Sequence, residues 1–261
     1  MIIEYFLNFT VARFVKIILN VVSYDFFIMI SVIIPTLNEE KLIGFTLKCL
    51  RNQDFSGKYE VIVADSCSTD NTVRIARKYA DKVVIDRKGG VSAGRNLGAR
   101  AARGEILVFV DADVYVLPNF LSTINKHFRD KNLIGLQIAL MATSYPHIKW
   151  HVLGGIFHRL SFKLNFPIAS TGAFACRRKP FFEVGGFNEK LRLGEDVDLG
   201  MRLARYAKIH GKYLKYTSDT FVMASTRRLE KWGMIKVLTR WPLGYFIWRF
   251  FKKNLAYDPI R

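Results

Sequence analysis

From residue 31 onward, short apolar runs alternate with segments of helical spacing, and this alternation constrains the fold more than any other feature. The runs SVIIPT, YEVIVAD, KVVID and ILVFVDAD are almost wholly apolar up to their ends, as in strands buried on both faces. Between them, Ile43, Leu47 and Leu50 recur at helical spacing, STDNT can start a second helix, and VSAGRNLGARAARG predicts a third helix with a small-residue face. The pattern predicts an α/β fold with a mostly parallel central sheet and helices on both faces.

Polar side chains follow three of the predicted strands at their carboxyl ends. Asn38 and Glu39 follow the first strand, Asp65 ends the second, and Asp111 and Asp113 end the fourth. In a parallel sheet these ends meet at one edge, where ligands gather. Alternation along an extended chain puts the last two carboxylates on one side, so they need a cation or hydrogen-bond donors between them. A divalent cation that carries phosphates would neutralise such a site, because carboxylate oxygens are suitable hard ligands.

The composition and charge indicate which kinds of partner the chain could bind. The formal charge is +18, from 40 Lys and Arg against 22 Asp and Glu, which favours a polyanionic partner. Nucleic acid, an anionic membrane face and a phosphorylated small molecule all qualify, and a solvated basic surface is the other interpretation. Half of the residues are hydrophobic, which excludes a disordered chain. Cys49, Cys67 and Cys176 show no metal-ligand spacing and are typical of reduced thiols in a cytosolic protein.

The chain divides into three parts. Residues 1–28 are apolar but interrupted by charged residues, so they either form a helix lying on a membrane or, if translation starts at Met29, are not translated. Residues 29–226 hold the strand–helix pattern and form the main domain. Residues 227–261 are basic and aromatic, which predicts an amphipathic helical segment that packs on the core or rests on an anionic membrane face.

Six motifs occur in the order found in one enzyme family. SVIIPTLNEE, VIVADSCSTDNT, GGVSAGRNLGARAARGEILVFVDAD, STGAFACRR, VGGFNE and LGEDVDLGMRLAR together resemble family-2 glycosyltransferases. The resemblance implies the nucleotide-diphospho-sugar transferase (GT-A) fold for residues 29–226. It implies an inverting transfer of a hexose-type sugar from a nucleotide-diphosphate donor to a glycan or lipid-linked acceptor, with Mg²⁺ or Mn²⁺ as cofactor. It also implies that the enzyme takes part in the synthesis of cell-envelope glycans at the cytoplasmic face of a membrane.

The resemblance assigns a role to each matching residue. Asp196 would be the catalytic general base, Asp113 the metal ligand, and Asp111 would face the ribose or sugar. Arg95 would lie near the diphosphate, and Gly172 would border the junction of sugar and acceptor. The remaining contacts to the nucleotide sugar would come from Pro35, Thr36, Asn38, Glu39, Asp65 and Glu195.

Two other functions fit parts of the sequence. A nucleotidyltransferase can share the sheet and the acidic metal site, but it normally carries a Gly-rich basic loop after the first strand, where this chain has PTLNEE. A protein that binds nucleic acid or another anionic surface would suit the charge, but no recognition motif is visible and the aromatics mostly lie inside apolar runs. We therefore expect an enzyme whose partners are a donor, an acceptor and an anionic membrane surface, without nucleic acid.

Overall fold

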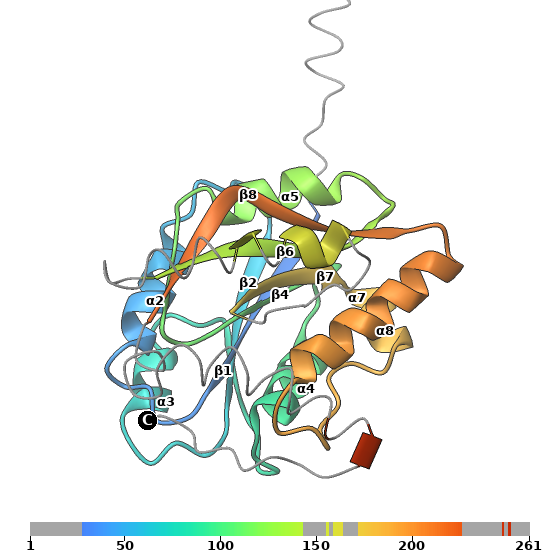
Figure 1. Cartoon of the computed structure of the whole chain (residues 1–261). Helices are drawn as coiled ribbons and strands as arrows, with labels where there is room; N and C mark the ends of the chain where they lie inside the picture. Colours follow the sequence, from blue (N-terminus) through green and yellow to red (C-terminus); the bar gives the residue numbers. More distant parts are fainter. Residues whose placement is uncertain are drawn as a thin grey trace, which may run out of the picture.

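The computed structural model describes residues 28–142, 155–156, 159–163, 172–225, 247 and 250–251. Within these residues a mixed sheet forms the centre of the molecule (Figure 1). Its strands are β1 (Ile30–Thr36), β2 (Tyr59–Asp65), β3 (Lys82–Ile85), β4 (Ile106–Val110), β5 (Val114–Val116), β6 (Leu133–Ala142), β7 (Ala173–Arg177) and β8 (Tyr213–Ala224). The order across the sheet is β3-β2-β1-β4-β7-β6-β8-β5.

The sheet has a parallel half and a mixed half. In the parallel half, β1 pairs with β2 and β4, and β2 pairs with β3. Ile30 lies opposite both Tyr59 and Ile106, so the amino ends of β1, β2 and β4 share one edge and their carboxyl ends share the other. In the mixed half, β7 is antiparallel to β4 and β6, β8 is parallel to β6, and β5 is antiparallel to β8.

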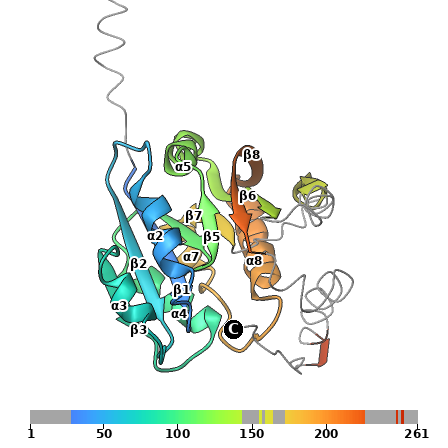
Figure 2. The ribbon, with the colours of Figure 1, turned by 90° about the vertical axis from the view of Figure 1, so that its left-hand side faces the viewer.

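Helices cover both faces of the sheet, as predicted. On one face, α2 (Ile43–Arg51), α3 (Thr72–Ala76) and α5 (Phe120–Phe128) pack on alternate residues of the strands. On the other face, α4 (Val91–Ala101), α7 (Arg178–Glu183) and α8 (Glu195–Ile209) pack on the intervening residues. Figures 1 and 2 show α2 and α3 separated from α7 and α8 by the sheet. Together with the strand order, this confirms the predicted α/β class.

The small-residue face of α4 allows a close approach to the sheet. A Cβ atom added at Gly98 would lie 2.5 Å from the Cγ2 atom of Ile33 in β1, which is shorter than side chains tolerate. A larger residue would push the helix away from the strand. The glycine therefore fixes the distance at which Arg95, one turn earlier in α4, meets the rest of the molecule.

The predictions for the two ends of the chain lie outside the described residues. Only Ile28 of the N-terminal extension and residues 247, 250 and 251 of the C-terminal segment are described. Among the helices that can be described, none combines the length and the apolar character that crossing a bilayer requires.

Candidate active site

The carboxylate of Asp65, at the end of β2, organises the two loops that follow β1 and β2. It is fully buried, and its Oδ1 atom accepts hydrogen bonds from the hydroxyls of Thr36 at 3.1 Å and Ser68 at 2.5 Å. Its Oδ2 atom accepts from the Ser68 backbone amide at 2.8 Å. The Ser68 hydroxyl also accepts from the backbone amide of Asn38 at 2.8 Å, so Asp65 ties the first loop to the second.

A second set of hydrogen bonds joins the same loops. The Asn38 side-chain oxygen accepts from the Thr69 amide at 2.9 Å, and the Glu39 amide donates to the Thr72 hydroxyl at 2.8 Å. Asn38 has a φ of 55°, a left-handed conformation that Asn tolerates better than most residues. Four predicted nucleotide-sugar residues, Thr36, Asn38, Glu39 and Asp65, thus lie in one hydrogen-bonded platform at the carboxyl edge. Pro35, the fifth, lies beneath it beside α4, where a Cβ at Gly94 would be 3.7 Å from its own Cβ.

Arg95 links two further predicted site residues, Glu195 and Asp111. Its Nη1 atom donates to Glu195 Oε1 at 3.0 Å, and its Nη2 atom donates to Asp111 Oδ1 at 3.2 Å. The guanidinium also lies over the ring of Phe187, 5.4 Å from the centroid. Because the Arg95 and Glu195 side chains are nearly inaccessible to solvent, their ion pair is an internal link between α4 and the start of α8.

The loop that carries Asp111 and Asp113 begins earlier than predicted. The run ILVFVDAD predicts a strand that continues to the aspartates, whereas β4 ends at Val110 and the two aspartates lie in the connection to β5. The Thr46 hydroxyl in α2 lies 2.8 Å from the carbonyl oxygens of both Ala112 and Val114, which holds this connection against the helix. Ala112 is buried and the aspartates on either side are partly exposed.

Gly172 lies beside this loop, at the point where the chain enters β7. A Cβ atom there would be 3.6 Å from Asp111 Oδ2 and 3.2 Å from a methyl group of Leu140. A larger residue at this position would therefore crowd the carboxylate. The structure thus places Gly172 next to the loop that carries Asp111.

Asp196 occupies the first turn of α8 and has a strongly perturbed acidity. The helix begins at Glu195, after Gly194 in a left-handed conformation with a φ of 79°. The Oδ1 atom of Asp196 accepts from the Val197 amide at 2.8 Å. Burial and the neighbouring charge of Glu195 raise the pKa of Asp196 to about 7, against the opposing effect of Arg95. A carboxyl group with such a pKa exchanges a proton near neutral pH.

The start of α8 is held in place by a further ion pair. Asp198 accepts from Arg202 one turn later at 2.5 Å and 2.8 Å. Arg202 also donates to the carbonyl oxygen of Val184 at 2.6 Å, at the end of α7. The turn that carries Asp196 is therefore fixed both to its own helix and to the preceding one.

The described residues fit a metal that arrives with a phosphorylated ligand. Among them, no group of three His, Cys, Asp or Glu side chains is placed to hold an ion. Of the predicted pair, Asp111 is bonded to Arg95. Mg²⁺ in proteins is commonly held by one or two carboxylates and completed by substrate phosphates and water. Asp113 together with a diphosphate would suit that arrangement.

Sequence reasoning missed three residues that shape the site: Thr46, Ser68 and Asn96. Thr46 holds the aspartate loop, and Ser68 joins the two donor-side loops. Asn96 lies next to Arg95 and is buried, and its side chain bonds both the amide and the carbonyl oxygen of Phe187, at 2.9 and 2.8 Å. The signal for Asn96 was its position on the predicted small-residue face, where a polar side chain needs a partner.

Comparison with known proteins identifies the family to which this fold and this arrangement of residues belong. The family model described as Glycosyl transferase family 2 matches residues 31–185. This match covers more than half of the chain, so the chain belongs to glycosyl transferase family 2. Membership confirms the resemblance drawn from the six motifs and favours it over the nucleotidyltransferase and surface-binding alternatives.

Related sequences include two transferases of poly(ribitol phosphate). TarS, a poly(ribitol-phosphate) beta-N-acetylglucosaminyltransferase of Staphylococcus aureus, is 38% identical over 118 residues, which are 41% of this chain and 21% of TarS. The poly(ribitol-phosphate) beta-glucosyltransferase of Bacillus spizizenii is 41% identical over 95 residues, which are 33% of this chain and 15% of that protein. The matched region thus spans about a fifth of these relatives or less.

Solved structures of glycosyltransferases share the fold. The crystal structure of S. aureus TarS 1–349 with UDP-GlcNAc has a TM-score of 0.63 and 27% identity, covering 76% of this chain and 59% of that chain. The mannosyltransferase PcManGT of Pyrobaculum calidifontis, with GDP-Man and Mn²⁺, has a TM-score of 0.59 and 26% identity, covering 74% and 56%. These similarities confirm the predicted GT-A fold.

Proposed function

We propose that this chain transfers a sugar from a nucleoside-diphosphate donor to a hydroxyl group of a glycan or polyol-phosphate acceptor, with inversion and with a divalent metal. The carrying observation is the gathering of carboxylates at the carboxyl edge of the sheet. Asp65 ends β2, Asp111 and Asp113 follow β4, and Asp196 opens α8. Arg95 joins two of these elements directly.

The nucleoside end of the donor occupies the platform formed by the loops after β1 and β2. The TarS structure with UDP-GlcNAc supports a uridine nucleotide as the donor. Asp65 is fully buried, and Thr36 and Ser68 already bond both of its oxygens. Asp65 therefore positions the platform, and Asn38 and Glu39 on its rim supply the contacts.

The leaving group and the metal share the loop after β4. Breaking the bond between the sugar and the diphosphate builds negative charge on the leaving oxygen, and a divalent metal stabilises that charge as a Lewis acid. Asp113 holds the metal, and Asp111, fixed by Arg95, lines the sugar side of the same loop. Mn²⁺ in the PcManGT structure supports a metal of this kind.

Asp196 takes the proton from the acceptor. The acceptor oxygen forms a bond to the anomeric carbon as the bond to the diphosphate oxygen breaks, so the configuration of that carbon inverts. The hydroxyl proton passes to the Asp196 carboxylate, whose pKa of about 7 makes it a competent base near neutral pH. Glu195 is already paired with Arg95, which leaves it to position the turn and tune its neighbour.

The relatives also support a class of acceptor and a cellular location for the enzyme. TarS and the Bacillus enzyme are transferases of poly(ribitol phosphate), a phosphodiester polymer. A repeated hydroxyl-bearing polymer of the cell envelope, lipid-linked at one end, is the acceptor that we propose here. Such an acceptor places the enzyme at the cytoplasmic face of the membrane during synthesis.

The test is donor binding by the Asp113→Asn variant. Calorimetry with UDP-GlcNAc and Mn²⁺ should show metal-dependent binding for the wild-type chain and little or none for the variant, with unchanged circular dichroism. Asp54→Asn, a change at an exposed carboxylate after α2, is the matched control and should bind as wild type. Equal affinity of the two variants would remove Asp113 from the metal site, and no binding by the wild-type chain would overturn the donor assignment.

A further inference from the structure

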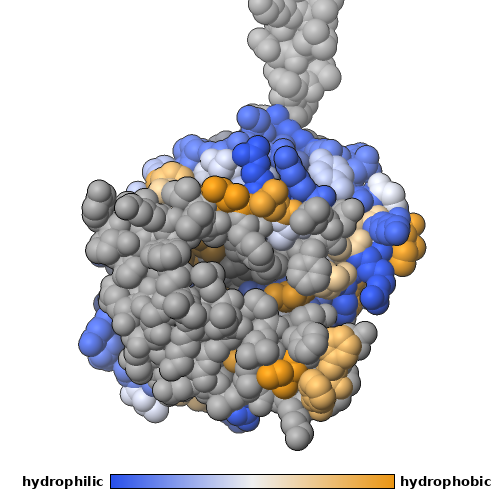
Figure 3. Space-filling view, in the orientation of Figure 1, coloured by the Kyte–Doolittle hydropathy of each residue, from blue (hydrophilic) through white to orange (hydrophobic). Residues whose placement is uncertain are grey.

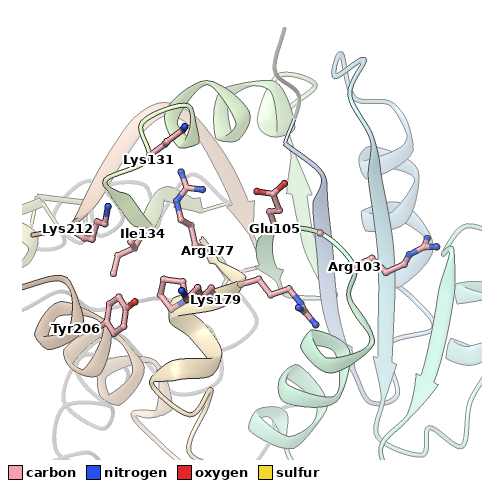
Figure 4. Close-up of a pocket in the computed structure, with 11 residues that line it drawn as sticks. Arg103, Glu105, Lys131, Ile134, Arg177, Lys179, Tyr206 and Lys212 are labelled. Atoms are coloured by element: carbon pink, nitrogen blue, oxygen red, sulfur yellow. The ribbon is translucent and has the colours of Figure 1, made fainter. Parts of the chain in front are cut away.

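A basic pocket lies at the amino edge of the sheet, opposite the candidate active site. Hydrophilic residues gather along this upper rim of the molecule in Figure 3. The pocket has a volume of about 490 Å³, and its walls include Glu105 and the cationic side chains of Lys131, Arg177, Arg178, Lys179 and Lys212 (Figure 4). These residues come from the chain before β4, the turn before β6, the end of β7 with the start of α7, and the turn before β8. They converge because all of these chain ends meet at one edge.

Backbone carbonyl groups hold the Arg177 guanidinium in this pocket. It donates to the carbonyl oxygens of Leu133, Phe128 and Asp130, at 2.9, 2.8 and 3.0 Å. Burial lowers the pKa of Arg177, and the neighbouring charges of Glu105 and Asp130 oppose that effect. The carbonyl partners fix the direction of the guanidinium without removing its charge.

The lysines of the pocket also keep most of their charge. Lys212 donates to the side-chain oxygen of Asn132 at 3.0 Å, which is a neutral partner. The Lys179 ammonium lies 3.9 Å from the Glu183 carboxylate, a surface contact that contributes little. Lys131 is exposed at the rim. All three can therefore turn toward an anion in the pocket.

Arg178 adds a cation that no described carboxylate bonds. Its guanidinium lies over the ring of Phe182, 5.1 Å from the centroid. Its buried Nε–H group has no hydrogen-bond acceptor among the described residues. A buried donor without an acceptor is costly, so extra negative charge beside this guanidinium is favourable.

Arg103 also borders the pocket but belongs to a different contact. Its guanidinium bonds the buried carboxylate of Glu60 at 3.1 Å. Figure 4 shows that it extends away from the other labelled cations. We therefore count it with Glu60 as a neutral pair.

The remaining charges around the pocket do not cancel. The five cations face three carboxylates, those of Glu105, Asp130 and Glu183, so two positive charges are left over. Two of these carboxylates are occupied by neutral donors: Asp130 accepts from the Tyr213 hydroxyl at 2.6 Å, and Glu183 accepts from the Tyr206 hydroxyl at 2.6 Å. A phosphate monoester carries about two negative charges near neutral pH, which matches this excess. A phosphodiester, with one negative charge, would offset half of it.

The pocket has room and uncharged walls for more than a phosphate group. Ile134, Pro180 and the ring of Tyr206 complete its lining. Sites for small organic molecules commonly enclose about 300–1,000 Å³ and combine such walls with a few well-placed polar groups. An organic phosphate would set its carbon skeleton against these walls and its phosphate against the cations, whereas inorganic phosphate would leave the walls uncovered.

We infer that this pocket binds a soluble organic phosphate monoester of the size of a sugar phosphate. The inference goes beyond the proposed function and does not depend on it. β1 has seven residues, so at about 3.3 Å per residue the two edges of the sheet lie roughly 23 Å apart. The phosphate monoester is therefore a ligand distinct from the sugar donor at the carboxyl edge.

The test is calorimetry with glucose 6-phosphate in the presence of EDTA. Chelation removes the divalent metal on which the proposed donor site depends, so the titration reports on the pocket. The wild-type chain should bind glucose 6-phosphate. Glucose 6-sulfate has the same skeleton and one negative charge, so it should bind at least about tenfold more weakly. Glucose itself should show no binding.

Two triple variants locate the binding site. Lys131→Gln, Lys179→Gln and Lys212→Gln together should weaken glucose 6-phosphate binding about a hundredfold, because each removes a charge-assisted contact. Circular dichroism and Mn²⁺-dependent UDP-GlcNAc binding of this variant should match wild type. Lys41→Gln, Lys58→Gln and Lys78→Gln make the same change in net charge at exposed positions outside the pocket, and this control should bind glucose 6-phosphate as wild type does.

Several results would overturn the inference. These are no binding of glucose 6-phosphate by the wild-type chain, equal affinity for the phosphate and sulfate esters, and equal loss in the two triple variants. Cosedimentation with phosphatidylcholine vesicles that contain phosphatidic acid, dependent on the three pocket lysines and without glucose 6-phosphate binding, would also overturn it, since the phosphate would then belong to a lipid. Lost UDP-GlcNAc binding by the wild-type chain, with glucose 6-phosphate still bound, would count against the proposed function alone.

Discussion

The pKa of Asp196 predicts that this residue lowers the stability of the fold at neutral and alkaline pH. In the folded chain burial and Glu195 raise that pKa to about 7, whereas an unfolded aspartate has the ordinary value of 3.8. Between these two pH values the folded chain holds a proton that the unfolded chain has released. The free energy of unfolding therefore has a contribution that is complete below pH 4 and is lost as the pH rises through 7.

The size of the effect follows from the same difference. Each pH unit between the two values corresponds to about 1.4 kcal/mol, which gives an upper limit of about 4 kcal/mol. The Asp196 side chain keeps partial contact with solvent, which weakens the effect of burial and of the Glu195 charge on its pKa, so about 2 kcal/mol is the better expectation. For a domain of this size that corresponds to roughly 4–8 °C in melting temperature.

The Asp196→Asn substitution isolates this pH-dependent contribution to the free energy of unfolding. The amide keeps the shape of the side chain and an oxygen that can accept the hydrogen bond from the Val197 amide. At pH 8 the variant should melt about 4–8 °C above the wild-type chain, and at pH 4 the two should melt together. It should also lose sugar transfer by about two to four orders of magnitude, because it removes the base. The gain in stability and the loss of activity come from one carboxylate.

Scanning calorimetry at pH 4, 6 and 8 measures the difference between variant and wild type. The control Asp54→Asn changes an exposed carboxylate and should give the same small difference at each pH. If Asp196→Asn stabilises the chain equally at pH 4 and pH 8, or destabilises it at pH 8, the raised pKa is wrong. Near wild-type transfer by the variant would instead remove Asp196 as the base.

Three more perturbations test the surroundings of this residue. Glu195→Gln removes the adjacent charge that raises the pKa of Asp196, so the acid side of the pH profile of kcat/KM should shift down by about one pH unit. An unchanged pH profile would contradict the effect of Glu195 on Asp196. Ser68→Ala removes the hydroxyl between Asp65 and the loop after β1, so calorimetry should show about tenfold weaker donor binding, and unchanged affinity would count against the platform. Gly98→Ala forces a methyl group against β1 and should cost about 1–3 kcal/mol in urea denaturation, whereas an unchanged midpoint would contradict the close packing of α4.

The parallel half of the sheet was predictable because its signals are local. Each strand there is a continuous apolar run that ends in a polar residue, and each following helix shows its own spacing. The strand order of the mixed half was not predictable, because β7 inserts between β4 and β6 from a position more than sixty residues after β4. Nothing in the local pattern of β7 tells whether it runs parallel or antiparallel to its neighbours.

The individual site residues were predictable, but their contacts were not. Asp111, Arg95 and Glu195 each belong to a recognisable motif, whereas the pairing of Arg95 with Glu195 spans 100 residues and depends on where the fold places the start of α8 relative to α4. The hydroxyl of Ser68 is closer to prediction, because a Ser three residues after a strand-ending Asp can close a local turn. Local hydrogen bonds leave a trace in the sequence, and contacts between residues far apart in the chain leave much less.

The contact between Arg95 and Asp111, which the sequence did not predict, changes the metal site expected at the two aspartates after β4. The sequence alone indicates that the like charges of Asp111 and Asp113 repel each other and that one metal ion could offset both charges. In the structure Arg95 bonds Asp111 from within the protein. A cation near Asp113 then no longer has to offset both carboxylates, so a single Asp113 with the donor diphosphate suffices as its ligand set. Metal affinity should consequently depend on the presence of the nucleotide, and an ion bound tightly without nucleotide would contradict this division of roles.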